Sequence, residues 1–197
     1  MPLIFEESIL TTQSIENKPL VKHLYIFVHG FQGCSLDMEI FKTYLLLYNP
    51  NSCFLFSKSN ETNTNKDIGE MGKKLAEEVK EYIDHHFAKL EKLGRISFLA
   101  HSLGGLIARA ALPLLEEYKK KMCSFVSLSS PHFGYMFSDS KVICAGLWVL
   151  KKWYGAQSLE QLSFSDQTEL TDCFLYKLAK ADVILQMHCR ELTGSRM

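Results

Sequence analysis

Short runs rich in β-branched and aromatic residues recur along the chain, separated by longer segments of helical periodicity. The apolar positions of the first run, Leu24–Val28, are continuous, which is typical of a parallel strand buried on both faces. Three further runs have the length and composition of strands. The pattern therefore predicts strands at residues 24–28, 53–56, 96–99 and 123–129.

Between these runs, apolar residues recur at intervals of three and four, which predicts amphipathic helices. We expect helices over residues 37–48, 67–90, from 103 past 111, 142–154 and 171–180. Pro113 should shorten the third of these helices. Residues 156–162 are expected to form a loop with a short turn, and residues 182–187 a last strand. The alternation predicts an α/β fold with a mostly parallel, doubly wound sheet.

Length and composition suit one globular domain. Residues 1–22 have weak periodicity and are interpreted as a lead-in, and residues 23–197 as a single domain. Hydrophobic residues make up 47% and charged residues 22% of the chain, which indicates a soluble globular protein. Lys plus Arg and Asp plus Glu each number 22, so nothing favours a nucleic-acid partner.

The cysteines and the apolar runs bear on compartment and cofactors. The six cysteines are scattered without metal-ligand spacing, so we expect free thiols in a reducing cytoplasm, no metal and no cofactor. The N-terminus lacks the features of a signal peptide. The longest apolar run, Val142–Leu150, is about half the length of a membrane span. We therefore expect a cytoplasmic protein without a membrane span.

The chemistry centres on the segment Ala100-His101-Ser102-Leu103-Gly104. Here the period changes from that of a strand to that of a helix, with Ser102 at the corner and Gly104 two residues later. That arrangement is typical of a nucleophile elbow, although Ala100 replaces the usual first glycine. The other interpretation of Ser102 is a simple helix cap.

Three loops leave the carboxyl ends of predicted strands, where ligands bind in open α/β sheets: residues 29–33, 101–104 and 129–134. We predict Ser102 as the nucleophile and the backbone amides of Phe31 and Leu103 as the oxyanion hole. His29 is interpreted as a residue that holds its own loop. His132 remains open as either a catalytic base or a packing residue, with packing favoured.

These residues carry a resemblance. Residues 28–33, 96–107 and 125–132 resemble the serine esterase family of lipase-like α/β-hydrolases, and more narrowly the C-terminal domain of the proteins called family with sequence similarity 135. The resemblance extends from about His23 to Lys180. It implies an α/β-hydrolase fold and cleavage of carboxylic (lipid or acyl) esters through an acyl-serine. It also implies an Asp and a His that follow the nucleophile in chain order.

The chain departs from that family after Lys180. His188 precedes Glu191, which reverses the expected order, so the catalytic acid and base stay unassigned. We expect the domain to be incomplete at its C-terminus, with the last strand or strands missing.

Three functions stay open. The first is an esterase acting on a small-molecule or lipid ester. The second is a catalytically weak or inactive hydrolase-fold domain that binds a ligand or a protein partner, and the partner cannot be named. The third is an acyltransferase or peptidase on the same fold.

Overall fold

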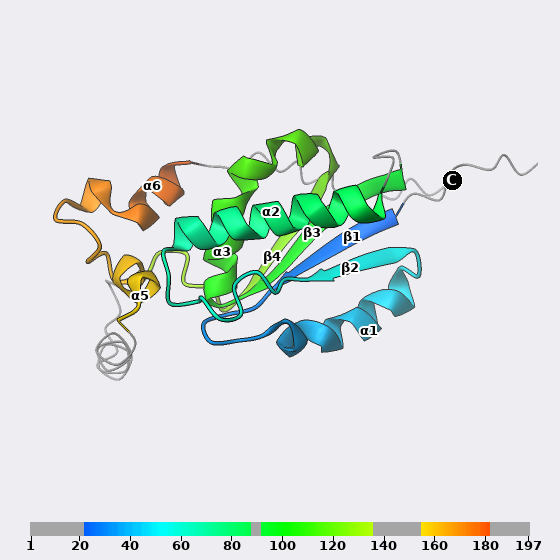
Figure 1. Cartoon of the computed structure of the whole chain (residues 1–197), viewed down its shortest axis with the longest axis horizontal. Coiled ribbons are helices and arrows are strands. Elements are labelled where there is room, and N and C mark those ends of the chain that lie inside the picture. The colour runs from blue at the N-terminus through cyan, green and yellow to red at the C-terminus, as the bar shows by residue number, and fades with distance from the viewer. Residues whose placement is uncertain (1–21, 88–91, 136–154, 182–197) are drawn as a thin grey trace, which may run out of the picture.

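A parallel sheet forms the centre of the molecule (Figure 1). The computed structural model describes residues 22–87, 92–135 and 155–181. Within these residues the strands are β1 (Lys22–Val28), β2 (Ser52–Phe56), β3 (Leu93–His101) and β4 (Met122–Leu128). They pair in the order β2-β1-β3-β4, and every pairing is parallel. The four strands predicted from the sequence are confirmed, with β1 and β3 as the central pair.

The helices follow the predicted order, with three differences. They are α1 (Glu39–Tyr48), α2 (Ile68–His86), α3 (Leu103–Ala111), α5 (Gln157–Leu162) and α6 (Phe174–Lys180), with short 3₁₀ helices η1 (Ser35–Met38), η3 (Leu112–Lys121) and η4 (Leu170–Asp172). Helix α2 ends at His86, before the predicted end at residue 90. The expectation of a loop at residues 156–162 is wrong, because burial of Leu159 and Leu162 in the core stabilises a helix that the local pattern does not indicate. The last helix begins at Phe174 rather than Thr171, because residues 170–172 form η4.

Some predicted elements lie outside the described residues: the lead-in up to residue 21, the helix at 142–154 and the strand at 182–187. Pro113 stands in the first turn of η3, and α3 ends just before it, as predicted. None of the helices in the described ranges is long and apolar enough to cross a membrane.

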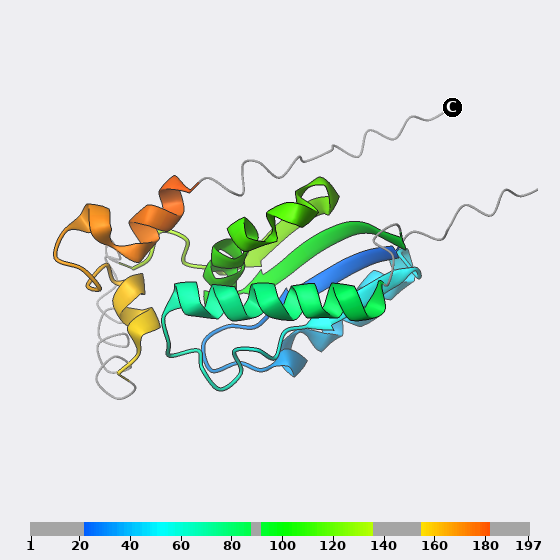
Figure 2. The ribbon, with the colours of Figure 1, turned by 45° about the horizontal axis from the view of Figure 1, so that its top comes forward.

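The two faces of the sheet are covered differently. Helices α2 and α3 lie on one face and α1 on the other (Figures 1 and 2). On the α2–α3 face the apolar residues of β1 and β3 are fully buried and form one core with both helices, whereas Cys53 of β2 and Phe125 of β4 are half-buried beside it. This core includes Leu24, Ile26, Ile96 and Phe98, each 0% exposed. Alternation along the strands places the remaining strand side chains on the α1 face.

Helices α2 and α3 touch at Gly72. A Cβ at this position would stand 2.6 Å from the Cβ of Ala110 and 2.9 Å from its carbonyl carbon. These neighbours are backbone or next to it, so they cannot rotate away as a long side chain could. The absence of a side chain at Gly72 therefore allows the close packing of α2 on α3.

We predict that Gly72→Ala lowers the free energy of unfolding by roughly 1 to 2 kcal/mol, although alanine favours helix by about 1 kcal/mol, because the two helices must separate. Urea denaturation measures the change. Glu77→Ala, at an exposed position of α2, is the control and should stay within about 0.5 kcal/mol of the original chain. A stability gain in Gly72→Ala would refute the packing argument.

A short polar network crosses the α1 face. The Nε2 atom of His23 lies 2.8 Å from Ser97 Oγ, which lies 2.7 Å from Ser124 Oγ. The ring of His23 also stacks on Tyr25. Burial, with a smaller contribution from the charge of Arg95, lowers the pKa of His23 from 6.5 to about 4. The imidazole is therefore neutral in the folded protein near pH 7.

A lowered histidine pKa links stability to pH. Between pH 6.5 and about 4 the unfolded chain binds a proton at His23 that the folded chain does not bind. Stability from this group is therefore complete above pH 6.5 and falls as the pH drops toward 4. We predict a loss of roughly 1 to 2 kcal/mol, after discounting for the half-exposed position.

The measurement is urea denaturation near neutral pH and again at a pH close to 4.5. His23→Gln should show a smaller loss of stability than the original chain, and His85→Gln, an exposed control, should show the same loss. Equal pH dependence in His23→Gln and the original chain would contradict the prediction.

Candidate active site

Ser102 lies on the tight turn that the sequence predicts between a strand and a helix. β3 ends at His101 and α3 begins at Leu103, and Ser102 between them has φ 52° and ψ −123°. A positive φ at a serine costs on the order of 1 to 3 kcal/mol and persists only where its surroundings enforce it. Two hydrogen bonds hold the turn, from Ser102 N to Leu128 O (2.9 Å) and from Gly105 N to Ser102 O (3.1 Å).

Two glycines let the neighbouring loops approach this turn. A Cβ on Gly104 would stand 2.4 Å from Val28 O and 2.5 Å from His29 O, at the end of β1. A side chain at Gly104 would therefore clash with the backbone at the end of β1. A Cβ on Gly30 would stand 3.0 Å from the Cβ of Ser102. The loop after β1 and the predicted nucleophile are therefore in direct contact.

Strained backbone gathers at the ends of three strands. Gln32, Ser102 and Ser129, which follow β1, β3 and β4, have φ of 54°, 52° and 52°. Non-glycine residues seldom adopt this conformation, and such residues cluster at functional sites. These strands are adjacent in the sheet, so the three loops meet at one edge. That edge is where the sequence predicts the chemistry.

The loop after β1 is anchored by two residues of the polar segment 59–66, Thr64 and Glu61. Gln32 N donates to Thr64 Oγ1 (3.0 Å), and Ser35 N donates to Glu61 Oε1 (2.7 Å). Within the loop, Cys34 N donates to Asp37 Oδ2 (2.9 Å), and this bond lowers the pKa of the Asp37 carboxyl below its usual value. In the sequence, the polarity of residues 59–66 is the one signal for this anchoring role.

Two histidines lie near the turn without reaching the Ser102 hydroxyl. His29 is 2% exposed, and its Nδ1 donates to the carbonyl of Gly30 (3.0 Å). This confirms the interpretation that His29 holds its own loop. His101 is exposed, and its Nδ1 lies near the position that a Cβ on Gly30 would take.

Both ring nitrogens of His132 have partners away from Ser102. Its Nε2 lies 2.7 Å from Ser127 Oγ, and its Nδ1 lies 3.4 Å from Nη1 of Arg109. Because Arg109 can only donate, Nδ1 accepts and the ring proton lies on Nε2. Burial, and then the Arg109 charge, lower the pKa of His132 below 6.5. These contacts support the packing interpretation of His132.

Arg109 joins three parts of this edge. From α3 it donates to the carbonyl of His132 (3.5 Å) and to the carbonyl of Leu178 in α6 (3.3 Å). Across the described ranges, no side chain forms a hydrogen bond with the Ser102 hydroxyl. His188 and Glu191 lie outside those ranges. The nucleophile and its loops are therefore described, and a base and an acid are not.

An apolar cavity of about 340 Å³ lies between the loop after β4 and α6. Figures 1 and 2 place α5 and α6 beyond the end of the sheet at which α3 begins. Ser102 does not line the cavity, but His132 does, and His132 Cε1 lies 3.3 Å from the position of a Cβ on Gly105. The remaining lining residues are Phe133, Phe164, Leu170, Leu175, Tyr176 and Ala179.

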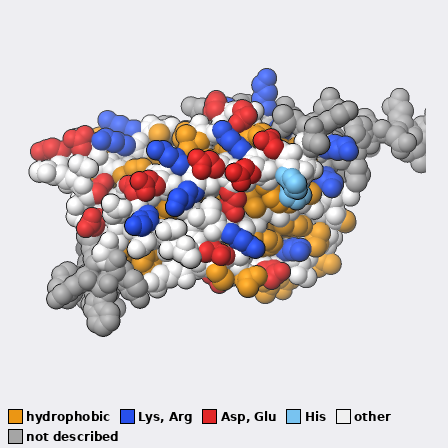
Figure 3. Space-filling view, in the orientation of Figure 1, with side chains coloured by type: hydrophobic (Ala, Val, Ile, Leu, Met, Phe, Trp, Pro, Cys, Tyr) orange, Lys and Arg blue, Asp and Glu red, His pale blue; other side chains and the backbone are white. Residues whose placement is uncertain are grey.

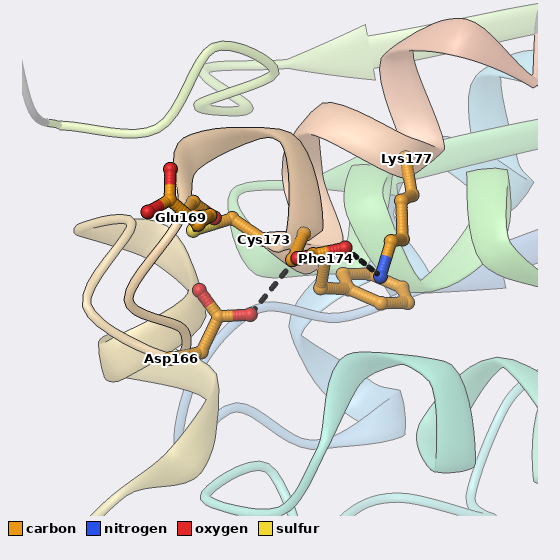
Figure 4. Close-up of polar contacts among 6 residues, drawn as sticks. Asp166, Glu169, Cys173, Phe174 and Lys177 are labelled. Carbon is orange, nitrogen blue, oxygen red and sulfur yellow. Dashed lines mark hydrogen bonds and ion pairs between the residues drawn. The ribbon is translucent and has the colours of Figure 1, made fainter.

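Polar contacts hold the segment around the start of α6, which contributes Leu170 and Leu175 to the cavity lining (Figure 4). The Asp166 carboxylate accepts from Phe174 N at 2.8 Å, and an ion pair joins Lys177 to Asp172 at 3.3 Å. The Sγ of the buried Cys173 lies 3.6 Å from the carbonyl oxygens of both Phe164 and Glu169, and burial raises the pKa of the thiol. These contacts join η4 and the start of α6 to the segment that follows α5.

Comparison with known proteins points to one group. The family model described as "Putative serine esterase (DUF676)" matches residues 18–191. The Saccharomyces cerevisiae protein "Putative lipase YDL109C" is 35% identical over 135 residues, which are 61% of this chain and 20% of that protein. "Putative lipase ROG1" from the same yeast is 29% identical over 153 residues, 68% of this chain and 22% of that protein. The chain thus spans about a fifth of the length of these relatives.

The fold has a counterpart among solved structures. The Bacillus licheniformis lipase BlEst2 in its propeptide form aligns with a TM-score of 0.54 and 19% identity, over 84% of this chain and 34% of that one. At that identity the likeness concerns the fold. The parallel sheet, the strained Ser102 turn and a family match over most of the length lead to one conclusion: the chain belongs to the DUF676 serine esterase family and has an α/β-hydrolase fold.

Proposed function

We propose that this chain hydrolyses carboxylic esters through an acyl enzyme on Ser102. The main support for this proposal is the turn at Ser102, which is strained and in contact with the loop after β1. In the proposed reaction the serine oxygen forms a bond to the acyl carbon, and the alcohol leaves with the proton of the hydroxyl. Water then releases the acid and restores the serine.

The oxyanion of the tetrahedral intermediate needs preorganised donors. We assign this role to the backbone amides of Phe31 and Leu103, since Leu103 follows the nucleophile and Phe31 follows Gly30. The contact between Gly30 and Ser102 and the anchoring of the Gln32 amide on Thr64 support the assignment. A donor of this kind contributes roughly 3 to 4 kcal/mol to lowering the barrier.

The apolar cavity suits the acyl part of the ester. It lies at the edge of the sheet that carries Ser102, and among its lining residues only His132 and the Tyr176 hydroxyl bring polar atoms. Arg109 holds both the His132 side of the cavity and α6. We assign the cavity to a hydrocarbon chain, which makes lipid or other acyl esters the substrate class.

A second candidate function is ligand binding without efficient turnover. It is favoured by one observation, that the Ser102 hydroxyl has no base among the side chains described. A serine hydroxyl without a base is a weak nucleophile near neutral pH. The experiment below separates the two functions.

We also propose a reducing, cytoplasmic setting. The cysteines within the described ranges, Cys34, Cys53, Cys123 and Cys173, are all free thiols, which supports this assignment.

Hydrolysis of a short-chain p-nitrophenyl ester tests the role of Ser102. If Ser102 forms the acyl enzyme, Ser102→Ala lowers kcat by on the order of 10³-fold or more, and labelling by a fluorophosphonate probe is lost. Ser163→Ala, at the end of α5, is the control and should keep rate and labelling. A change of less than about tenfold in Ser102→Ala, with no labelling of the original chain, would refute the acyl enzyme and favour the binding function.

The acyl cavity is tested with esters of increasing chain length. Each buried methylene contributes about 0.8 kcal/mol, so kcat/KM should rise roughly fourfold per methylene until the cavity is full. Ala179→Trp fills the cavity from an exposed position and should remove this increase while short esters react as before. The control is Leu114→Trp, on η3. An unchanged length profile in Ala179→Trp would place the acyl chain elsewhere.

A further inference from the structure

Helix α1 has apolar residues on two sides. It packs on β2, and Phe41 and Leu45 are its half-buried apolar side chains. A second stripe, centred roughly 110° around the helix, contains Ile40, Tyr44 and Leu47, which are 63%, 59% and 75% exposed. Figure 3 shows hydrophobic side chains gathered over this part of the surface, at the lower right. A helix that is apolar on two sides is typical of a helix packed between two layers.

The sheet face under α1 is only half covered. The register places Phe27, Leu99 and Val126 side by side across β1, β3 and β4 on this face. Phe27 is 1% exposed, whereas Val126 is 41% exposed. Helix α1 lies on the β2 side of the face (Figures 1 and 2). Among the described elements, none covers the half formed by β3 and β4.

We propose that two copies of this chain associate face to face through this side of the sheet. Each copy has a projecting apolar helix and, on the β3–β4 half beside it, the half-buried Leu99 and the exposed Val126, which lie next to the polar pair Ser97 and Ser124. The twofold axis runs between the α1-covered half and the β3–β4 half of this face. In this arrangement α1 of each copy packs on the β3–β4 half of the other. Ile40 and Leu47 then contact the partner subunit's Val126. The surface is self-complementary, as an isologous interface requires.

The exposed apolar area of η1 and α1 supplies about two thirds of what a dimer needs. Five side chains contribute, namely Leu36, Ile40, Tyr44, Leu47 and Tyr48. Taking about 150 Å² for a fully exposed large side chain, their exposed fractions amount to on the order of 500 Å² per copy. A stable interface buries about 800 Å² on each partner. Val126 and the polar rim of the surface supply the difference.

A lipid surface fits this face less well. Helices that lie on membranes carry Lys and Arg on their polar side. Helix α1 has one acidic residue, Glu39, and one basic residue, Lys42, and its basic residue is half-buried. A second copy is therefore the partner that the charge and shape of this face favour.

The molar mass in solution tests the proposal. Size-exclusion chromatography with light scattering should give twice the 22.5 kDa of one chain at micromolar concentration. Ile40→Lys combined with Leu47→Lys should raise the dimer dissociation constant at least about a hundredfold. Val126→Lys, on the opposite half of the same interface, should do the same. Leu114→Lys, at a residue 41% exposed on η3, should remain a dimer.

Melting temperatures of dilute samples show whether each variant is folded, and only folded variants are compared. A monomeric original chain would overturn the proposal. In that event, a lower melting temperature in Ile40→Lys/Leu47→Lys would show that other residues of the same chain cover the face. Binding of the monomer to phosphatidylcholine vesicles, lost in the same variant, would assign the face to lipid. A dimer that persists in Val126→Lys would overturn the face-to-face arrangement.

Discussion

The contact between the first turn of α3 and the end of β1 determines the geometry of the whole edge. Gly104 stands where any side chain would meet the carbonyl oxygens of Val28 and His29. The start of α3 therefore lies directly against β1, and Ser102 must turn sharply to connect β3 with α3. This close approach also brings the loop after β1 onto Ser102. A single missing Cβ thus places the predicted nucleophile and the predicted oxyanion loop together.

Much of this arrangement could be predicted from local sequence. The change of period at Ser102 is a strong signal for the turn, because the strand pattern and the helix pattern meet within one residue. Glycine at position 104 has a direct steric cause, since a side chain there would meet the end of β1. The anchors Thr64 and Glu61 could not be predicted, because their partners Gln32 and Ser35 are distant in sequence and the contacts depend on tertiary packing. Helix α5 could not be predicted from local sequence either, because its conformation depends on the burial of Leu159 and Leu162 in the core.

Polar residues at this edge of the sheet stabilise the loops around Ser102. His29 and His132 both lie close to the site, yet the hydrogen bond of His29 goes to the carbonyl of Gly30 in its own loop, and those of His132 go to Ser127 on β4 and Arg109 on α3. Arg109 extends this function by joining α3, the loop after β4 and α6. In this chain, closeness of a histidine to Ser102 is therefore a poorer guide to its function than the partners of its ring nitrogens.

The central pairing of β1 with β3 has a consequence for folding. The bond between His23 and Ser97 joins residues 74 positions apart, and α1, β2 and α2 must be accommodated between them. Pairing of such high contact order forms slowly. Ser102 and the loop of Gly30 come from the ends of these two strands, so they meet only after the pairing is complete. The turn at Ser102 and its contact with the loop of Gly30 consequently form only in chains in which β1 and β3 have paired.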